Sequence, residues 1–272
     1  MGTRLTVIVD NVAVGDWTGE WGLSILAEHR GKHILVDTGA SDLFQKNMER
    51  LGLALAEVDY GVLSHAHFDH ANGMPCFFRE NKTADFYMQE AAEENCYKKP
   101  QVFYQYIGIP RHVLRDYAHR IRRVSGKYLL TDGAWLLGHT TPGLAAAGKR
   151  ERMYRRKGLW WRPDDFAHEQ SLVLETDKGL VIINSCSHGG AANIIREVRE
   201  AFPRQSVYGL VGGFHLFNKT DEEVRRLALE LTQAGTAFLC TGHCTKQRAY
   251  DILHQELGDR LHQLQVGLVM EF

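Results

Sequence analysis

The 272-residue chain has no hydrophobic run close to the roughly 18 residues that a transmembrane helix needs. Its five cysteines are an odd number scattered through a long chain, which does not indicate a disulfide framework. Charge of one sign is not in excess either, because the formal net charge is -1. These absences predict a globular protein of a reducing cytoplasm, with neither a membrane nor a nucleic acid as its partner.

Repeats, low-complexity tracts and Pro/Gly-rich linkers are also missing, so we expect a single domain over residues 1–272. Short apolar segments predict strands at 5–9, 23–27, 33–36, 60–63, 171–175, 180–183, 207–211, 237–240 and 264–269. Amphipathic segments predict helices at about 41–51 (with Ser41 as the N-cap), after Gly190, at 222–231 and from about Thr245. This alternation in both halves predicts an α/β fold in which two sheets pack together and helices cover them.

The middle of the chain, residues 98–162, differs in composition from the rest. It holds 15 Lys and Arg and three acids, a local charge of +12, whereas the other residues, with 17 Lys and Arg and 30 acids, carry -13. The stretch is also rich in aromatic residues. We interpret it as an insertion or lid, partly helical between Pro110 and Val124, that attracts an anionic substrate. A solvated basic face with its own small core is the alternative.

The strongest signal is a short histidine-rich segment after the strand at 60–63, in which His65, His67, Asp69 and His70 occur within six residues. His65 and His67 are two residues apart, so in extended backbone they point the same way. Burying three unpaired histidines for packing alone would be costly. Imidazole and carboxylate are ligands of zinc, manganese and iron alike. The pattern therefore predicts a metal centre with one or two ions, zinc first and manganese or iron as alternatives.

Further candidate ligands follow the ends of later predicted strands. His188 and His243 are predicted as ligands. For His215 three roles stay open, namely ligand, substrate-binding group or proton donor. His139 falls in the basic stretch and is not expected to bind metal. Cys186 is a possible extra ligand, with a small buried cysteine as the alternative.

The segment 65–70 is similar to the His-x-His-x-Asp-His signature of the metallo-β-lactamase superfamily, and its flanks at 36–39 and 73–74 agree with it. The resemblance implies a four-layer αββα sandwich in which Asp37 supports the metal ligands without binding the metal itself. Cys186 stands where many members place a bridging aspartate. Together with 64–70, the segments 22–24, 175–180, 186–188, 212–216 and 243–245 resemble the branch named for a 7,8-dihydropterin-6-methyl-4-(β-D-ribofuranosyl)-aminobenzene-5'-phosphate synthase, which is dihydropteroate-synthase-like.

This resemblance implies a hydrolase in which a metal-activated water attacks a small anionic substrate. Asp69 is the candidate general base and His215 the candidate proton donor. Gly189 and Gly190 lead into a helix whose free N–H groups suit a phosphate. The expected substrate is therefore phosphorylated.

The tryptophans of the basic stretch, Trp160 and Trp161, are candidates for stacking on a ring of the substrate. Packing within the stretch itself is the alternative for both.

Two other activities stay open. One is a pterin-type synthase that condenses a dihydropterin pyrophosphate with a ribofuranosylaminobenzene phosphate. The other is a di-iron oxidoreductase, although such members usually rely on an acidic bridging ligand and an attached electron-donor domain. The basic stretch carries no RNA-binding motif, so nucleic-acid processing is not expected. The oligomeric state is left open.

Overall fold

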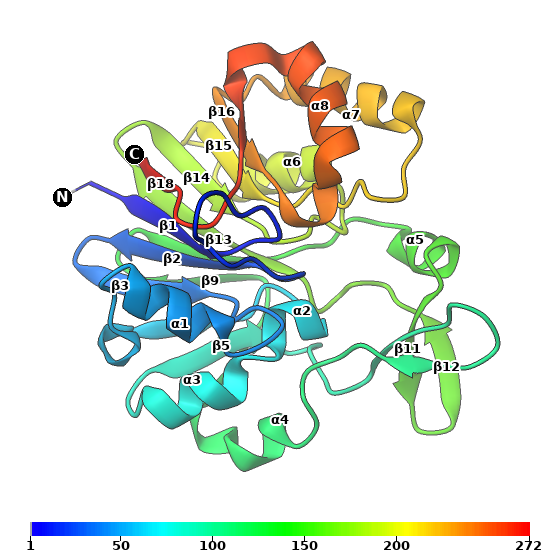
Figure 1. Cartoon of the computed structure of the whole chain (residues 1–272). Coiled ribbons are helices and arrows are strands. Elements are labelled where there is room, and N and C mark those ends of the chain that lie inside the picture. The colour runs from blue at the N-terminus through cyan, green and yellow to red at the C-terminus, as the bar shows by residue number, and fades with distance from the viewer. Residues whose placement is uncertain (1) are drawn as a thin grey trace.

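The computed structural model describes residues 2–272. Two seven-stranded sheets lie face to face, with helices on both outer sides (Figure 1). The first sheet has the order β18-β1-β2-β3-β4-β5-β8. Its strands are β1 (Arg4–Val9), β2 (Ser24–His29), β3 (Lys32–Val36), β4 (Tyr60–Val62), β5 (Asp85–Gln89), β8 (Ile121–Val124) and β18 (Val269–Glu271).

The second sheet has the order β17-β16-β15-β14-β13-β10-β9. Its strands are β9 (Lys127–Thr131), β10 (Ala134–Gly138), β13 (Gln170–Thr176), β14 (Gly179–Ile183), β15 (Val207–Gly212), β16 (Phe238–Thr241) and β17 (Leu261–Gln263). The α-helices are α1 (Leu43–Arg50), α2 (Phe68–Ala71), α3 (Met74–Glu80), α4 (Val113–Asp116), α5 (Leu144–Arg150), α6 (Ala191–Ala201), α7 (Asp221–Ala234) and α8 (Lys246–Leu257). Single 3-10 turns are η1 (Leu55–Glu57), η2 (Ala118–Arg120), η3 (His243–Thr245) and η4 (Gly258–Arg260).

The alternation of side chains along β14 shows how the layers form. Val181 and Ile183 face the core between the sheets, whereas Leu180 and Ile182 face α6, α7 and α8. Successive side chains of a strand point to opposite faces, so an entirely apolar strand packs on both sides. A third cluster joins the outer face of the first sheet to α1 and α3. The expected four-layer αββα sandwich is confirmed.

Two local expectations are wrong. The segment 264–269 is not one strand, because β17 ends at Gln263 in the second sheet and β18 begins at Val269 in the first. The residues between them cross from one sheet to the other. Ser41 is not the N-cap of α1, which begins at Leu43 after Asp42. Instead, the Ser41 hydroxyl donates to Glu20 and accepts the Leu43 N–H, which forms a turn before the helix.

The basic stretch 98–162 is divided among three sheets. β8 extends the first sheet, and β9 and β10 belong to the second. A third sheet, which we call the small sheet, contains β6 (Cys96–Lys98), β7 (Gln105–Tyr106), β11 (Met153–Lys157) and β12 (Trp160–Pro163). Figure 1 shows β11 and β12 beside α5, away from the sandwich. The expected helical part between 110 and 124 is limited to α4 and η2, and it ends in β8 because that strand pairs with β5.

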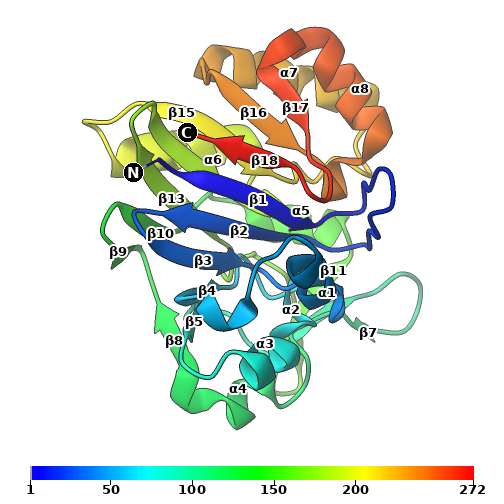
Figure 2. The same cartoon turned by 60° about the vertical axis from the view of Figure 1, so that its left-hand side comes forward.

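Both ends of the described chain lie at one edge of the sandwich, as Figure 2 shows. Thr3 and Phe272 exchange backbone hydrogen bonds of 3.1 and 2.9 Å. Within residues 2–272, none of the helices has the length and apolar character required to cross a membrane.

Candidate metal centre

The predicted site residues lie where parallel strands of both sheets end. β3 and β4 are parallel neighbours in the first sheet, and β14, β15 and β16 are parallel in the second. Their carboxyl ends point to the same edge of the sandwich. Asp37 follows β3, and His65 follows β4. In the second sheet, Cys186 and His188 follow β14, His215 follows β15 and His243 follows β16.

His65, His67 and His188 form the first group of candidate ligands. The His65 ring centroid lies 4.7 Å from that of His67, and the His188 centroid lies 5.0 Å from both. Burial lowers the pKa of each well below 6.5, so the rings are neutral and keep a lone pair for a metal. Nε2 of His65, Nε2 of His67 and both ring nitrogens of His188 are buried without a hydrogen-bond partner.

Asp69, His70, His243 and Cys186 form the second group. Nε2 of His70 lies 3.2 Å from Nε2 of His243 and 3.3 Å from Sγ of Cys186. Oδ2 of Asp69 lies 3.6 Å from Nε2 of His243. Burial raises the pKa of the Asp69 carboxyl and lowers that of His243 well below its usual value. One oxygen, two nitrogens and one sulfur thus surround a second position.

Asp37 supports the histidine motif through hydrogen bonds, which is the role that the resemblance implies for it. Its Oδ1 accepts the backbone N–H of Ser64 at 2.7 Å. Its Oδ2 accepts the Ser64 hydroxyl at 2.6 Å and Nδ1–H of His70 at 2.8 Å. Because His70 donates through Nδ1, its Nε2 remains free to bind a metal.

His215 lies between the centre and an acid from the basic stretch. Its Nε2 lies 2.5 Å from Oε2 of Glu151, and the other oxygen of Glu151 accepts from Lys219 at 2.9 Å. The Cys244 sulfur accepts the His215 backbone N–H at 3.3 Å. Burial lowers the pKa of His215, but the contacts with Cys244 and Glu151 outweigh it and raise the pKa to about 9. Nδ1 of His215 is buried and has no hydrogen-bond partner.

Backbone strain gathers at this edge. Nine non-glycine residues within 2–272 have a positive φ, and five of them border the site, namely Asp37, Phe166, Ser187, His215 and His243. Such conformations are costly for residues with a Cβ and persist where the surroundings enforce them. The strand ends are therefore bent in a way that presents these side chains to a common point.

Two cavities open on the centre, and both are lined by His188 and His215. The larger, of about 320 Å³, lies beside the first turn of α6 and includes Arg150 and Lys219. The smaller, of about 90 Å³, has an aromatic wall with Phe217. Trp21, Phe68, Lys98 and Met153 complete much of the smaller cavity.

The structure does not bring the two predicted ring-stacking residues to the centre. The Trp160 side chain is 75% exposed at the end of the small sheet. Trp161 stacks on Tyr104 with ring centroids 3.5 Å apart. Neither lines the two cavities, as far as the described chain shows. Packing within the basic stretch, the alternative interpretation, describes Trp161, because its ring contacts those of Tyr104 and Tyr97.

His139 also lies outside the cluster. Its Nδ1 is 2.8 Å from Glu197 and its Nε2 is 2.8 Å from Ser171. Because both ring nitrogens have partners, His139 has no free lone pair for a metal.

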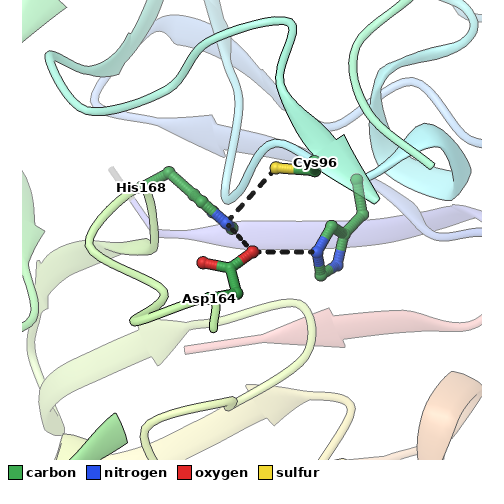
Figure 3. Close-up of side chains that lie close together, drawn as sticks. Cys96, Asp164 and His168 are labelled. Carbon is green, nitrogen blue, oxygen red and sulfur yellow. Dashed lines mark hydrogen bonds and ion pairs between the residues drawn. The ribbon is translucent and has the colours of Figure 1, made fainter. Parts of the chain in front are cut away.

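Sequence reasoning missed a buried group next to His67 that contains Cys96, Asp164 and His168. In Figure 3 the His168 ring points at both the Asp164 carboxylate and the Cys96 sulfur. It also missed Glu169, whose carboxylate accepts the backbone N–H groups of His188 and Gly189 at 2.8 and 3.0 Å. These residues form no recognisable motif in the sequence, because Cys96 lies in β6 whereas the others lie in the segment before β13.

The side chains of the two groups fit a divalent metal. Their unpartnered nitrogens would be an energetic cost if no ligand satisfied them. Imidazole, carboxylate and thiol together are the donor set of zinc sites. His65, His67 and His188 can hold one ion. Asp69, His70 and His243, whose ligand atoms lie 3.2–3.8 Å apart, can hold a second, with Cys186 near both groups.

Comparisons with known proteins show the family and the fold. A sequence profile of the metallo-beta-lactamase superfamily matches residues 18–198, and the chain belongs to that superfamily. A relative from Methanocaldococcus jannaschii, 26% identical over 92% of this chain and 90% of its own length, is named 7,8-dihydropterin-6-methyl-4-(beta-D-ribofuranosyl)-aminobenzene-5'-phosphate synthase.

Two solved structures extend the comparison. The crystal structure of Tm1679, described as a metal-dependent hydrolase of the beta-lactamase superfamily, is 28% identical and covers 99% of both chains with a TM-score of 0.85. Zn²⁺-bound PqqB from Methylobacterium extorquens is 10% identical, covers 99% of this chain and 100% of its own, and has a TM-score of 0.59. The second likeness shows the fold alone.

Proposed function

We propose that the protein is a metal-dependent hydrolase of a small, phosphorylated, ring-bearing substrate. The convergence of unpartnered, neutral histidine nitrogens beside two cavities carries this proposal. The likeness to a metal-dependent hydrolase at 28% identity supports it. Zinc is the proposed metal because the ligand set combines imidazoles with a carboxylate and a thiol.

A divalent metal bound here supplies Lewis acidity, which activates a water molecule and polarises an oxygen of the substrate. Asp69 is the general base of the proposal: its buried Oδ2, beside His243, takes the proton of the attacking water. His215 is the general acid. Glu151 holds its Nε2, so the unpartnered Nδ1 is the atom that gives a proton to the leaving group.

The larger cavity is the proposed place of the phosphate. The N–H groups of Gly189 and Gly190 already donate to Glu169 and Ser187, but no side chain at the N-cap bonds the first N–H groups of α6 itself. These groups and the helix dipole attract an anion. Lys219 and Arg150 are already paired with Glu151 and Glu223, so the cavity is not strongly positive by itself.

The smaller cavity is the proposed place of the ring. Trp21, Phe68 and Phe217 offer aromatic surfaces there, which suit a flat ring better than exposed Trp160 does. His188 and His215 stand where the two cavities meet, so the bond that breaks lies between ring and phosphate.

A synthase activity is the second candidate because a relative that spans most of the chain carries that name. It would use the same anion and ring contacts, but the metal would expel pyrophosphate from a dihydropterin ester.

The cytoplasm remains the proposed compartment.

Metal analysis joined to a substrate panel tests the proposal. Protein purified without added metal is expected to hold about two equivalents of zinc or manganese, one per group of ligands. Phosphodiesters, phosphomonoesters and a dihydropterin pyrophosphate, the last with and without a ribofuranosylaminobenzene phosphate, form the panel. His67→Ala should lose metal and turnover, whereas His254→Ala, on an exposed face of α8, should keep both.

The outcomes separate the candidates. Phosphoester cleavage that depends on His67 supports the hydrolase. Turnover only of the pterin pair identifies the synthase, and tightly bound iron with redox activity identifies the oxidoreductase. Protein without bound metal, unchanged by His67→Ala, would contradict all three.

A further inference from the structure

The histidines of the metal centre differ in how their second ring nitrogen is held. A metal-binding histidine usually donates its other N–H to a carboxylate, carbonyl or water, which fixes the ring. Three of the rings follow this rule, with Nδ1 on Ser64 (2.9 Å, for His65), Asp37 (2.8 Å, for His70) and Asn11 (3.1 Å, for His243). His67 and His188 have no such partner within hydrogen-bond distance in the described chain.

The two nitrogens of His67 have different surroundings. Nε2 is fully buried and makes no hydrogen bond. Nδ1 is not among the buried unpartnered atoms, and the ring lines the smaller cavity. The carboxylate that faces Nε2 belongs to Asp164, with Oδ2 at 4.0 Å. A shift of about 1 Å would bring this pair to ordinary hydrogen-bond length.

Asp164 has one free acceptor position for that bond. Its Oδ1 accepts the Phe166 backbone N–H at 2.9 Å, and its Oδ2 lies 3.2 Å from Nε2 of His168 (Figure 3). Nδ1 of His168 accepts the Ala66 backbone N–H at 3.2 Å, so the His168 proton is on Nε2 and is donated to Asp164. A carboxylate oxygen accepts two hydrogen bonds, which leaves one lone pair on Oδ2.

The neighbouring thiol does not give this group another chemistry. Sγ of Cys96 lies 3.7 Å from the same Nε2 of His168 that meets Asp164. Because both partners meet one nitrogen, the ring cannot pass a proton from the thiol to the carboxylate. Burial also raises the pKa of Cys96, which keeps it a thiol.

We propose that Asp164 is a positioning residue of the metal centre: it accepts Nε2–H of His67 and thereby presents Nδ1 of that ring to the metal. The inference rests on the proposed function, in which His67 is a ligand. Asp164 acts on a second ligand as well. It fixes Phe166, whose ring stacks on His188 with centroids 4.2 Å apart. His168 adds a link to the backbone between His65 and His67.

Asp164→Asn and Asp165→Asn are the matched pair that tests the proposal. The two acids are neighbours in the chain, but Asp165 is exposed and pairs with Arg155 at 3.3 Å. Loss of an outer partner typically weakens metal binding about 10–100-fold. We expect this loss of zinc affinity and faster removal of zinc by a chelator for Asp164→Asn, and wild-type values for Asp165→Asn.

An NMR spectrum of the wild-type protein tests the same contact and does not depend on the folding of a variant. In zinc-loaded protein labelled with ¹⁵N-histidine, His67 should carry an exchange-protected proton on Nε2 and metal on Nδ1. The signal is assigned by its loss in His67→Asn. Metal on Nε2 and a proton on Nδ1 would overturn the proposal.

The outcomes also separate this inference from the proposed function. Equal zinc affinity of Asp164→Asn and Asp165→Asn, with loss of zinc in His67→Ala, contradicts the positioning role alone. Failure of His67→Ala to change zinc content contradicts the metal centre itself. An additional metal equivalent that disappears in Cys96→Ser would show that His67, Cys96, Asp164 and His168 bind an ion of their own, against the proposal.

Discussion

The sandwich edge that carries the candidate metal ligands and the small sheet are both rich in side chains that can bind a ligand. The two regions differ in whether those side chains already have partners within the protein. At the edge, His65 and His188 are buried and have nitrogens without partners. In the small sheet, Trp161 stacks on Tyr104 and Arg156 lies over its ring. Buried nitrogens without a hydrogen-bond partner indicate that a ligand is missing. Aromatic and cationic groups that contact one another indicate a local core instead.

The largest effect is expected from a ligand at the edge. His188→Ala should lose bound metal and with it turnover, by more than the roughly 10–100-fold that an outer partner is worth. His139→Ala is the matched control, because the side chain of that histidine is also buried near a strand end but bonds Glu197 and Ser171. Metal content by mass spectrometry under native conditions measures both. Metal loss in His139→Ala with retention in His188→Ala would reverse the assignment.

The sequence predicted this edge because its signals are local. The spacing of His65, His67, Asp69 and His70 is fixed by one strand end and one helical turn. His188 and His243 were found because each follows an apolar strand, and parallel strands of one sheet end at the same edge. The layers of the fold followed from the alternation of strands and helices for the same reason.

Features that depend on long-range contacts were not predicted. Asp164 and His168 meet Cys96 across about 70 residues of chain, and no spacing records that contact. The charge of the stretch 98–162 suggested one insertion, but charge does not reveal pairing. β8 and β9 carry both basic and apolar residues, β10 carries no charged residue, and all three belong to the two main sheets.

A smaller effect is expected where the small sheet meets the edge. Lys98 in β6 lines the smaller cavity, whereas Lys157 in β11 is exposed outside both cavities of the centre. If Lys98 binds the anionic substrate, Lys98→Gln should lower kcat/KM about 10–100-fold, because a hydrogen bond to a charged group contributes about 1.5–3 kcal/mol. Lys157→Gln should leave kcat/KM unchanged. Equal losses in both variants, removed by salt, would instead show steering by the whole basic stretch.

The smallest effects are expected from the tryptophans of the small sheet. Trp161→Ala should lower the free energy of unfolding by about 1–2 kcal/mol, since an aromatic pair contributes about 0.5–1.5 kcal/mol beyond its buried area. Trp160→Ala, at an exposed position, should change it by less than about 0.5 kcal/mol. Urea titration measures the stabilities, and KM for a ring-bearing and a ringless phosphoester measures binding. A rise in KM confined to the ring-bearing substrate would show that Trp161 contacts the ring, and the small sheet would then belong to the site rather than to a core of its own.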